Sequence, residues 1–107
     1  VDYHMMRLCL RTGLVTIKDP DLRRRLVSRL WVDTQEELAI RQATGRAILS
    51  LVEKTRLSIG AIDGLFFKLG RSVCLETETP RCTDCPLSSH CAQDTALFQP
   101  VFRTTAY

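Results

Sequence analysis

The sequence predicts an all-α fold, a small helical domain of about four helices that ends in a cysteine-rich loop. Its 107 residues suffice for one domain. Apolar residues recur at helical spacing in four segments, and a residue that favours helix caps stands before each of them. No strand is predicted, and Leu14 to Lys18 is expected to be a short extended link.

The first helix is expected from about Tyr3 to Thr12. Asp2 is placed to cap it, because a carboxylate there accepts the free amides of the first turn. Gly13 is placed to end it. The expected core face consists of Met5, Met6, Cys9 and Leu10. Cys9 stands apart from the other cysteines, so it is interpreted as a buried thiol and not as a ligand.

The second helix begins at Asp19 and Pro20, as N-cap and first helical residue. Helical spacing predicts a core face of Leu22, Leu26, Val27 and Leu30. The opposite face carries Arg23, Arg24, Arg25 and Arg29. This arginine run has two interpretations, a solvated helix face or a set of phosphate contacts.

A capping box from Thr34 to Glu37 is expected to open the third helix. Its apolar stripe consists of Ile40, Ala43, Ala47, Ile48 and Leu51. Ser58 is the expected N-cap of the fourth helix, and Gly70 is expected to end it. The apolar positions of that helix are Ile59, Ile62, Phe66 and Leu69. Residues 1–73 therefore form the helical part, 74–91 the cysteine loop, and 92–107 a tail expected to pack back on the domain.

Charge is distributed unevenly along the chain. Residues 1–72 carry thirteen Lys or Arg against eight Asp or Glu, whereas residues 73–107 carry two against four. The net charge of +3 therefore comes from the part before the cysteine loop. Twelve of the fifteen cations are arginine, whose planar fork suits phosphate. An excess of this size is compatible with nucleic-acid binding but does not establish it.

Four of the five cysteines fall in one run, Cys74, Cys82, Cys85 and Cys91, spaced C-x7-C-x2-C-x5-C. So short a segment buries little core of its own, and four thiolates in it indicate one metal site. Two metals fit: a [4Fe–4S] cluster and a zinc ion, each held by four cysteines. The continuous run favours the cluster, since zinc sites more often draw on two separated pairs. For zinc, His90 is an alternative ligand.

Two other interpretations compete with a metal. Two disulfides would suit a small secreted domain, but no secretory signal is visible and Cys9 would be left unpaired. Four free buried thiols would be unusual at this density.

No apolar run approaches the length of a membrane span, so no membrane association is expected. Reduced thiols suit the cytoplasm or nucleus. The chain opens at Val1 without an initiator methionine, so we expect a piece of a longer protein.

Two stretches resemble the endonuclease III-like DNA glycosylases of the helix-hairpin-helix superfamily. The family's Val-Asp-Thr-His helix start is similar to the opening Val1-Asp-Tyr-His-Met-Met-Arg-Leu-Cys-Leu-Arg-Thr12. The family's helix end and iron–sulfur loop are similar to Leu69-Gly-Arg-Ser-Val-Cys74 together with Cys82-Thr-Asp-Cys-Pro-Leu-Ser-Ser-His-Cys91. The two motifs occur in the family's order and span essentially the whole chain.

The resemblance implies a [4Fe–4S] cluster on the four loop cysteines and DNA as the partner. It implies that Asp2 is catalytic, stabilising positive charge on the sugar as the base leaves or helping to deprotonate a nucleophile. The family's hairpin, and the lysine with which bifunctional members form a Schiff base, precede the Val-Asp motif. The hairpin half of a longer chain is therefore an expected partner. The expected function is the C-terminal part of a base-excision glycosylase that removes a flipped-out damaged or mispaired base, with lyase activity where that lysine is present.

DNA contacts are expected at Arg7, Arg11 and Arg71, which belong to the two family-like motifs, and at Arg81 in the loop. Two departures from the family concern this loop. Its first two cysteines are one residue further apart than usual, and Glu76 and Glu78 stand where the family usually has basic residues. Two alternatives therefore stay open: a noncatalytic nucleic-acid-binding or docking module with a structural cluster, and a small zinc-binding domain.

Overall fold

The computed structural model describes residues 3–30, 32–76 and 78–97. Four α-helices follow one another: α1 (Tyr3–Thr12), α2 (Pro20–Val27), α3 (Thr34–Thr55) and α4 (Ile59–Ser72). A short 3-10 helix, η1 (Cys82–Asp84), lies in the loop after α4. No strand occurs within the described ranges, so the predicted all-α class with four helices is confirmed.

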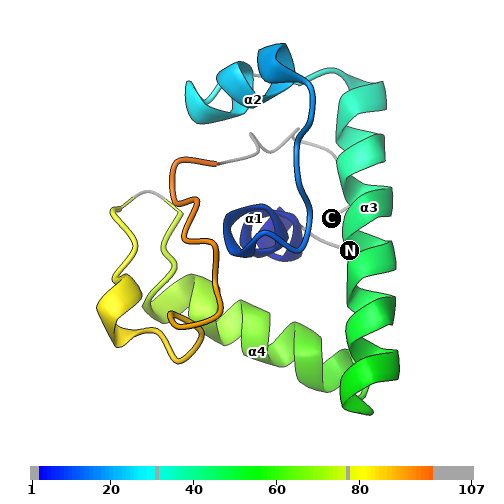
Figure 1. The fold of residues 1–107 in the computed structure, drawn as a ribbon, viewed down its shortest axis with the longest axis vertical. Coiled ribbons are helices and arrows are strands. Elements are labelled where there is room, and N and C mark those ends of the chain that lie inside the picture. The colour runs from blue at the N-terminus through cyan, green and yellow to red at the C-terminus, as the bar shows by residue number, and fades with distance from the viewer. Residues whose placement is uncertain (1–2, 31, 77, 98–107) are drawn as a thin grey trace.

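Helix α1 lies at the centre of the molecule, and α2, α3, α4 and the loop after α4 surround it (Figure 1). It contacts both α3 and α4. Its apolar side chains from Met6 to Leu10 are at most 1% exposed. Arg7 and Arg11 are buried as well, so α1 is enclosed on its polar side as on its apolar side.

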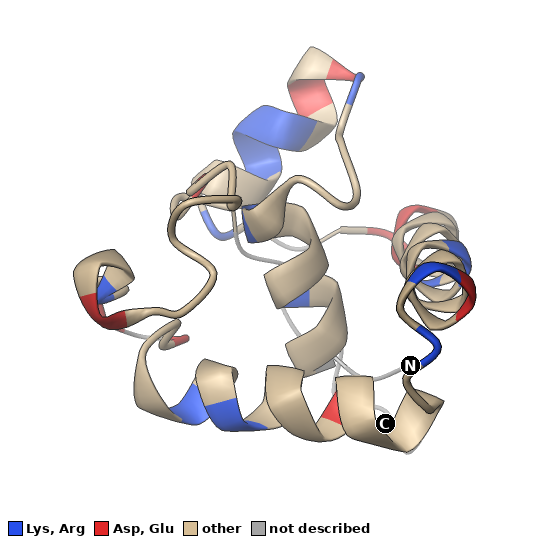
Figure 2. Cartoon of the chain, turned by 60° about the horizontal axis from the view of Figure 1, so that its bottom comes forward, with Lys and Arg blue, Asp and Glu red and all other residues tan. Residues whose placement is uncertain are grey.

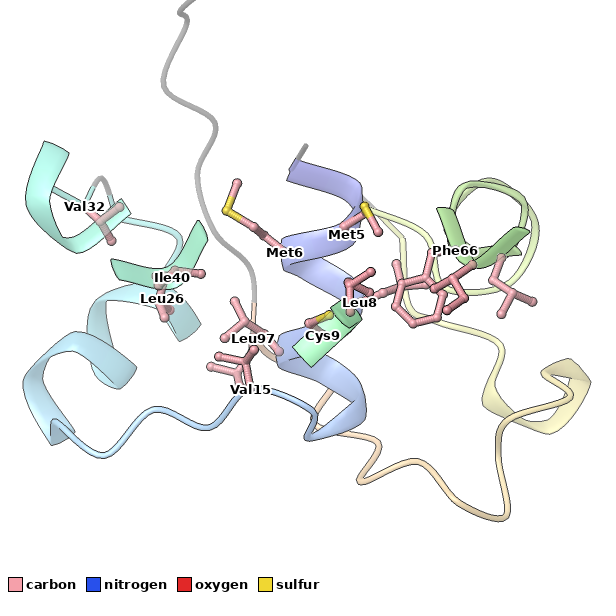
Figure 3. Packing of buried hydrophobic residues seen from close by; sticks show 14 residues of the cluster. Met5, Met6, Leu8, Cys9, Val15, Leu26, Val32, Ile40, Phe66 and Leu97 are labelled. Carbon is pink, nitrogen blue, oxygen red and sulfur yellow. The ribbon is translucent and has the colours of Figure 1, made fainter. Parts of the chain in front are cut away.

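The core forms around α1 from one face of each outer helix (Figure 3). Its members outside α1 include Leu26 of α2, Ile40 and Ile48 of α3, and Ile62, Phe66 and Leu69 of α4. All six are among the predicted core positions. Three other predictions were wrong: Val27, Leu30 and Ile59 are 41%, 46% and 53% exposed. Leu30 lies beyond the end of α2, and Val27 and Ile59 are terminal residues of their helices, where helical spacing no longer determines burial.

Cys9 is a buried thiol within the core, as predicted. It is 0% exposed, and burial raises its pKa to about 12 because a thiolate loses its hydration there. Such a thiol stays protonated and packs as a small apolar group.

Gly13 ends α1 with a φ of +87°, a conformation that a residue with a Cβ adopts only at a cost.

The caps of α2 and α4 are the predicted ones. The backbone N–H of Asp21 donates to the Asp19 carboxylate at 3.0 Å, and Pro20 is the first helical residue. At α4, the N–H of Ala61 donates to the Ser58 hydroxyl at 3.1 Å.

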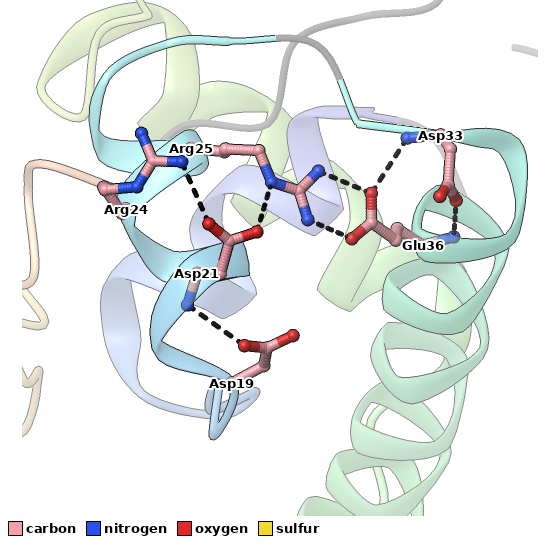
Figure 4. A network of polar contacts seen from close by, with 6 residues as sticks. All are labelled: Asp19, Asp21, Arg24, Arg25, Asp33 and Glu36. Carbon is pink, nitrogen blue, oxygen red and sulfur yellow. Dashed lines mark hydrogen bonds and ion pairs between the residues drawn. The ribbon is translucent and has the colours of Figure 1, made fainter.

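The capping box of α3 lies one residue before the predicted one. The N–H of Glu36 donates to Asp33 at 2.7 Å, and the N–H of Asp33 donates to the Glu36 side chain at 3.0 Å (Figure 4). Glu37 is instead buried, and its carboxylate pairs with Arg41 one turn later. Because glutamates stand three residues after both Asp33 and Thr34, the sequence alone supports either box.

Gly70 does not end α4, which continues to Ser72. Gly70 is needed because it has no side chain: a Cβ at this position would lie 2.9 Å from Nη2 of Arg7. The Gly70 carbonyl also accepts a hydrogen bond from that nitrogen at 3.2 Å. The glycine therefore serves close packing of an arginine against the helix, and the prediction that it stops the helix was wrong.

The arginine run of α2 is tied to carboxylates of the same molecule. Arg25 binds both Asp21 and Glu36, so it joins α2 to the start of α3 (Figure 4). Arg24 also pairs with Asp21, and Arg23 makes a two-bond pair with Asp94 at 2.7 and 3.0 Å. These ion pairs favour a structural role of the arginine run within the molecule over a role in phosphate contacts.

Residues 92–97 lie against the end of α1. The N–H groups of Ala92 and Asp94 donate to the carbonyls of Thr12 and Arg11 at 3.1 and 3.0 Å, and Leu97 is 2% exposed. The remainder of the expected tail, residues 98–107, lies outside the described residues. Among the helices described, none combines the length and the apolar character required to cross a membrane.

Candidate metal centre

The four loop cysteines line one hollow beside α1. Cys74 lies just beyond the end of α4, Cys82 and Cys85 flank η1, and Cys91 begins the final segment. The hollow has about 440 Å³ of space free of atoms, which includes its side open to solvent. Its apolar walls are formed by Leu8, Leu69, Val73, Pro80 and Leu87. The cysteine-rich run thus returns all four thiols to one place.

The surroundings of Cys91 raise the pKa of its thiol. Partial burial raises the pKa of Cys91, and the backbone N–H of Gln93, 3.2 Å from the sulfur, lowers it. Cys74, Cys82 and Cys85 raise it further, since neighbouring thiolates repel a fourth negative charge. All four thiols are half-buried and none is in a disulfide.

Backbone hydrogen bonds hold the loop in this shape. The N–H of Arg81 donates to the Val73 carbonyl at 2.8 Å and so closes the long segment between the first two cysteines. The N–H of Cys85 donates to the Cys82 carbonyl at 3.1 Å across η1. His90 donates from its backbone to Leu87 at 3.0 Å in the turn that leads to Cys91. The C-x2-C pair is therefore one turn of 3-10 helix, which presents its two sulfurs to the same side.

The thiols surround a hollow and do not converge on one point. Within residues 3–30, 32–76 and 78–97, no three His, Cys, Asp or Glu side chains come close enough to hold a single metal ion. The exposed His90, an alternative zinc ligand from the sequence, does not line the cysteine hollow. It lines a neighbouring apolar pocket together with Leu14, Leu57 and Phe66, and Cys91 lines both spaces.

Arg7 and Arg11, expected to contact DNA, are buried at 2% and 1% exposure. Arg11 donates to the carbonyls of Leu97 at 3.0 Å and Leu75 at 2.8 Å, and to the sulfur of Cys74 at 3.4 Å. A guanidinium enclosed in this way does not reach a phosphate. Both arginines belong to the interior beside the cysteine loop, and their contact with DNA stays a prediction that this burial does not favour.

Arg7 lies beside the same loop. It donates to the carbonyls of Gly70 and Cys74 at 3.2 and 3.4 Å, and its Nη1 is 3.9 Å from a carboxylate oxygen of Glu76. The two arginines, one helical turn apart on α1, hold the chain on either side of Cys74. The interior position of Arg7 and Arg11 has a signal in the sequence, because the apolar residues around them place α1 in the interior.

The Nη2 atom of Arg11 has no hydrogen-bond partner in the part of the chain that the structure describes. A buried guanidinium nitrogen without an acceptor is costly, by about 1–3 kcal/mol. It belongs to a side chain that lines the cysteine hollow. A hollow lined by four thiols and one buried cation suits an anionic group held by thiolates.

The other two arginines expected to bind DNA are exposed. Arg81 lies in the loop and donates to the carbonyl of Ser72. Arg71 lies on α4, with its guanidinium carbon 4.8 Å from the centre of the Phe67 ring. The four arginines therefore do not form one face. Asp2, the expected catalytic residue, lies outside the described residues.

Comparisons with protein-family models, with curated proteins and with solved structures find no match to this chain.

Proposed function

We propose that this chain is the iron–sulfur-binding C-terminal part of a DNA base-excision glycosylase similar to endonuclease III. The observation that carries the proposal is the single hollow lined by Cys74, Cys82, Cys85 and Cys91 with the buried guanidinium of Arg11. The two family-like sequence motifs lie on either side of it, since Arg11 comes from the first and the cysteines from the second.

A [4Fe–4S] cluster fits these residues better than zinc. Each of the four cysteines would bind a different iron of the cluster, so the sulfurs need to surround a volume. A zinc ion would need all four sulfurs about 2.3 Å from one point. The four cysteines of this chain line one hollow, and that arrangement supports the cluster.

The buried cation supports an anionic occupant. A [4Fe–4S] cluster with four thiolates carries net negative charge, and hydrogen bonds to its sulfurs stabilise it and tune its potential. Arg11 already donates to Cys74 and has Nη2 left for a further acceptor. When bound, the cluster would stabilise the loop and supply no chemistry to the excision itself.

Base excision itself is assigned by resemblance to Asp2, whose carboxylate would stabilise positive charge on the sugar as the base departs. The remainder of the active site, including the hairpin, would come from the other half of a longer chain. The proposed substrate is a damaged or mispaired base flipped out of the duplex. Free thiols in this number agree with a reducing compartment, and we propose the cytoplasm or nucleus.

A second candidate is a noncatalytic nucleic-acid-binding or docking module that keeps the cluster for structure. The observation that favours it is the acidic loop, in which Glu78 is exposed while the basic Arg7 and Arg11 are buried. Less positive charge is then available to phosphate than the sequence suggests.

The metal is tested by anaerobic reconstitution with iron and sulfide, followed by metal analysis. We expect about four irons and a brown colour with absorbance near roughly 400 nm. Alanine at Cys74, Cys82, Cys85 or Cys91 should abolish both, whereas Cys9→Ala should retain them because that thiol packs in the core. A colourless protein with one zinc, or a Cys82→Ala variant with full iron, would overturn the assignment.

The activity is tested with the full-length protein on duplexes that carry a damaged or mispaired base. Asp2→Asn should lose most base excision, because asparagine caps a helix nearly as well but carries no charge. If the wild type and Asp2→Asn excise the base equally well, Asp2 has no catalytic role. Cluster-loaded protein that binds DNA and excises no base would favour the noncatalytic module.

A further inference from the structure

An exposed stack of an aromatic ring and a cation lies on the outer face of α4. Phe67 is 42% exposed, and the guanidinium carbon of Arg71 lies over its ring at 4.8 Å from the centroid. The His4 ring of α1 meets Phe67 edge-on, with 5.3 Å between the centroids and 62° between the planes. We call Phe67, Arg71 and His4 the α4 stack.

The stack is not part of the core. Ile62, Phe66 and Leu69 form the buried face of α4, and Phe67 lies on the flank of that face, where its ring meets His4 of α1. An exposed phenylalanine gains little from burial there, although an aromatic face is a strong contact for a flat ligand. Phe67 is therefore placed for an external contact.

Arg71 differs from the other arginines expected to bind phosphate. Arg7 and Arg11 are buried, and Arg81 donates to a backbone carbonyl. Arg71 is exposed, and among the described residues no carboxylate or carbonyl is in hydrogen-bond or ion-pair contact with it. Stacking on Phe67 restricts its guanidinium while leaving the N–H donors for a ligand.

The surroundings leave the stack accessible and basic. Lys68 is exposed beside it, and Figure 2 shows two adjacent basic segments on α4. One turn earlier on the same face is Gly64, which has open space where a side chain would stand. Asp63, one turn before Phe67 on the same face, is half-buried and adds one carboxylate to the two cations. The face therefore keeps a net positive charge and has open space at Gly64.

We propose that the α4 stack binds nucleic acid at an unpaired base. The base stacks on the Phe67–Arg71 pair, and the adjoining phosphate receives hydrogen bonds and charge from Arg71 and Lys68. Exposed aromatic rings combined with cations are the chemistry by which proteins hold unstacked bases. This inference rests on the proposed function and adds to it a place for the strand near the displaced base, because His4 follows Asp2 by two residues.

The test measures affinity over a range of salt concentrations for two probes, a fully paired duplex and the same duplex with one unpaired base. Phe67→Leu keeps apolar volume and removes the aromatic face, so it should weaken binding of the unpaired-base probe about 10-fold and leave the paired duplex nearly unchanged. Arg71→Ala should weaken both probes and reduce the salt slope by about one.

Matched controls separate the stack from general effects. Arg46→Ala and Leu49→Ala remove an exposed cation and an exposed apolar residue of α3. Both should behave as wild type. Phe67→Tyr, which keeps the ring, should also retain the preference for the unpaired base. Circular dichroism and iron content of every variant show that its fold and cluster are intact.

The inference would be overturned if Phe67→Leu and Arg71→Ala both kept the affinity, the salt slope and the probe preference of the wild type. This face would then be assigned to another kind of partner. That result, obtained with iron-loaded protein, leaves the proposed function standing. Protein without a cluster would instead overturn the proposed function whatever the stack does.

Discussion

Arg11 donates a hydrogen bond to the sulfur of Cys74 across 3.4 Å from a side chain that is 1% exposed. The two residues are 63 positions apart in the chain, so the contact joins the central helix to the start of the cysteine loop. It places a buried positive charge beside the Cys74 sulfur.

Replacing Arg11 by methionine, which fills similar space without charge, should weaken the metal site and the fold. The change leaves the carbonyls of Leu75 and Leu97 without a buried donor. We expect a loss of about 3 kcal/mol in the free energy of unfolding, measured with urea. The cluster should also bleach faster in air. Arg46→Met on exposed α3 is the control, and equal cluster lifetimes in the two variants would contradict the role of Arg11.

Two glycines of α4 should respond oppositely to alanine. Alanine gains about 1 kcal/mol over glycine inside a helix, and at Gly64 nothing opposes it because the site is open. At Gly70 the added Cβ would displace the buried Arg7 guanidinium, which costs hydrogen bonds worth about 1–3 kcal/mol. Urea unfolding should therefore show Gly64→Ala stabilised and Gly70→Ala destabilised by about 1–2 kcal/mol. A stabilised Gly70→Ala would show that Arg7 moves aside without loss.

The helices and most of the core are predictable because they depend on local chemistry. Asp19 with Pro20, and Ser58, stand where a chain must satisfy free amides, and they are the observed caps. The capping box of α3 escaped prediction by one residue, because the choice between Glu36 and Glu37 depends on Arg25 and Arg41. Arg25 belongs to α2 and approaches Glu36 only once the helices have packed, whereas Arg41 lies one turn after Glu37 on α3 itself.

The four cysteines line one hollow, as their short run in the sequence suggests, whereas the surroundings of that hollow do not follow from the spacing. The acceptors for Arg11 come from Cys74, Leu75 and Leu97, far along the chain, so no local pattern marks it as an internal residue. The apolar run around Arg7 and Arg11 carries part of this information, since it requires α1 to be central. Phe67 was not singled out from the sequence, because an apolar residue next to Phe66 indicates packing as readily as exposure.

Glu36 should make stability depend on pH in the acid range. Hydrogen bonds from Arg25, followed by the N–H of Asp33, lower the pKa of Glu36 from 4.5 to about 2. Because the folded pKa is below the unfolded value, the stabilisation is complete above about pH 4.5 and is lost as the pH falls toward 2. Thermal melts of wild type and Glu36→Gln should therefore differ at pH 6 and converge near pH 2. The control Glu53→Gln, at an exposed position of α3, should follow wild type throughout. A constant difference between wild type and Glu36→Gln would contradict the linkage.

Glu76 and Glu78, neighbours in the acidic loop, should differ when each is changed to lysine. Glu76 is 34% exposed and 3.9 Å from the buried guanidinium of Arg7, so Glu76→Lys replaces an attraction by a repulsion. We expect it to lower the free energy of unfolding by about 1 kcal/mol, a value reduced by solvent screening. Glu78 is exposed, and Glu78→Lys should leave stability within about 0.5 kcal/mol.

The same pair of variants tests whether the loop faces DNA. If it does, Glu78→Lys removes a repelling charge and adds an attracting one, so it should tighten binding and steepen the salt slope by about one. Glu76→Lys should tighten binding less than its change of charge suggests, because the substituted side chain would lie beside Arg7 and be repelled by it. Unchanged affinity in Glu78→Lys, with the cluster and the fold intact, would show that the acidic loop points away from the nucleic acid. DNA contact would then rest on Arg71 and the outer face of α4.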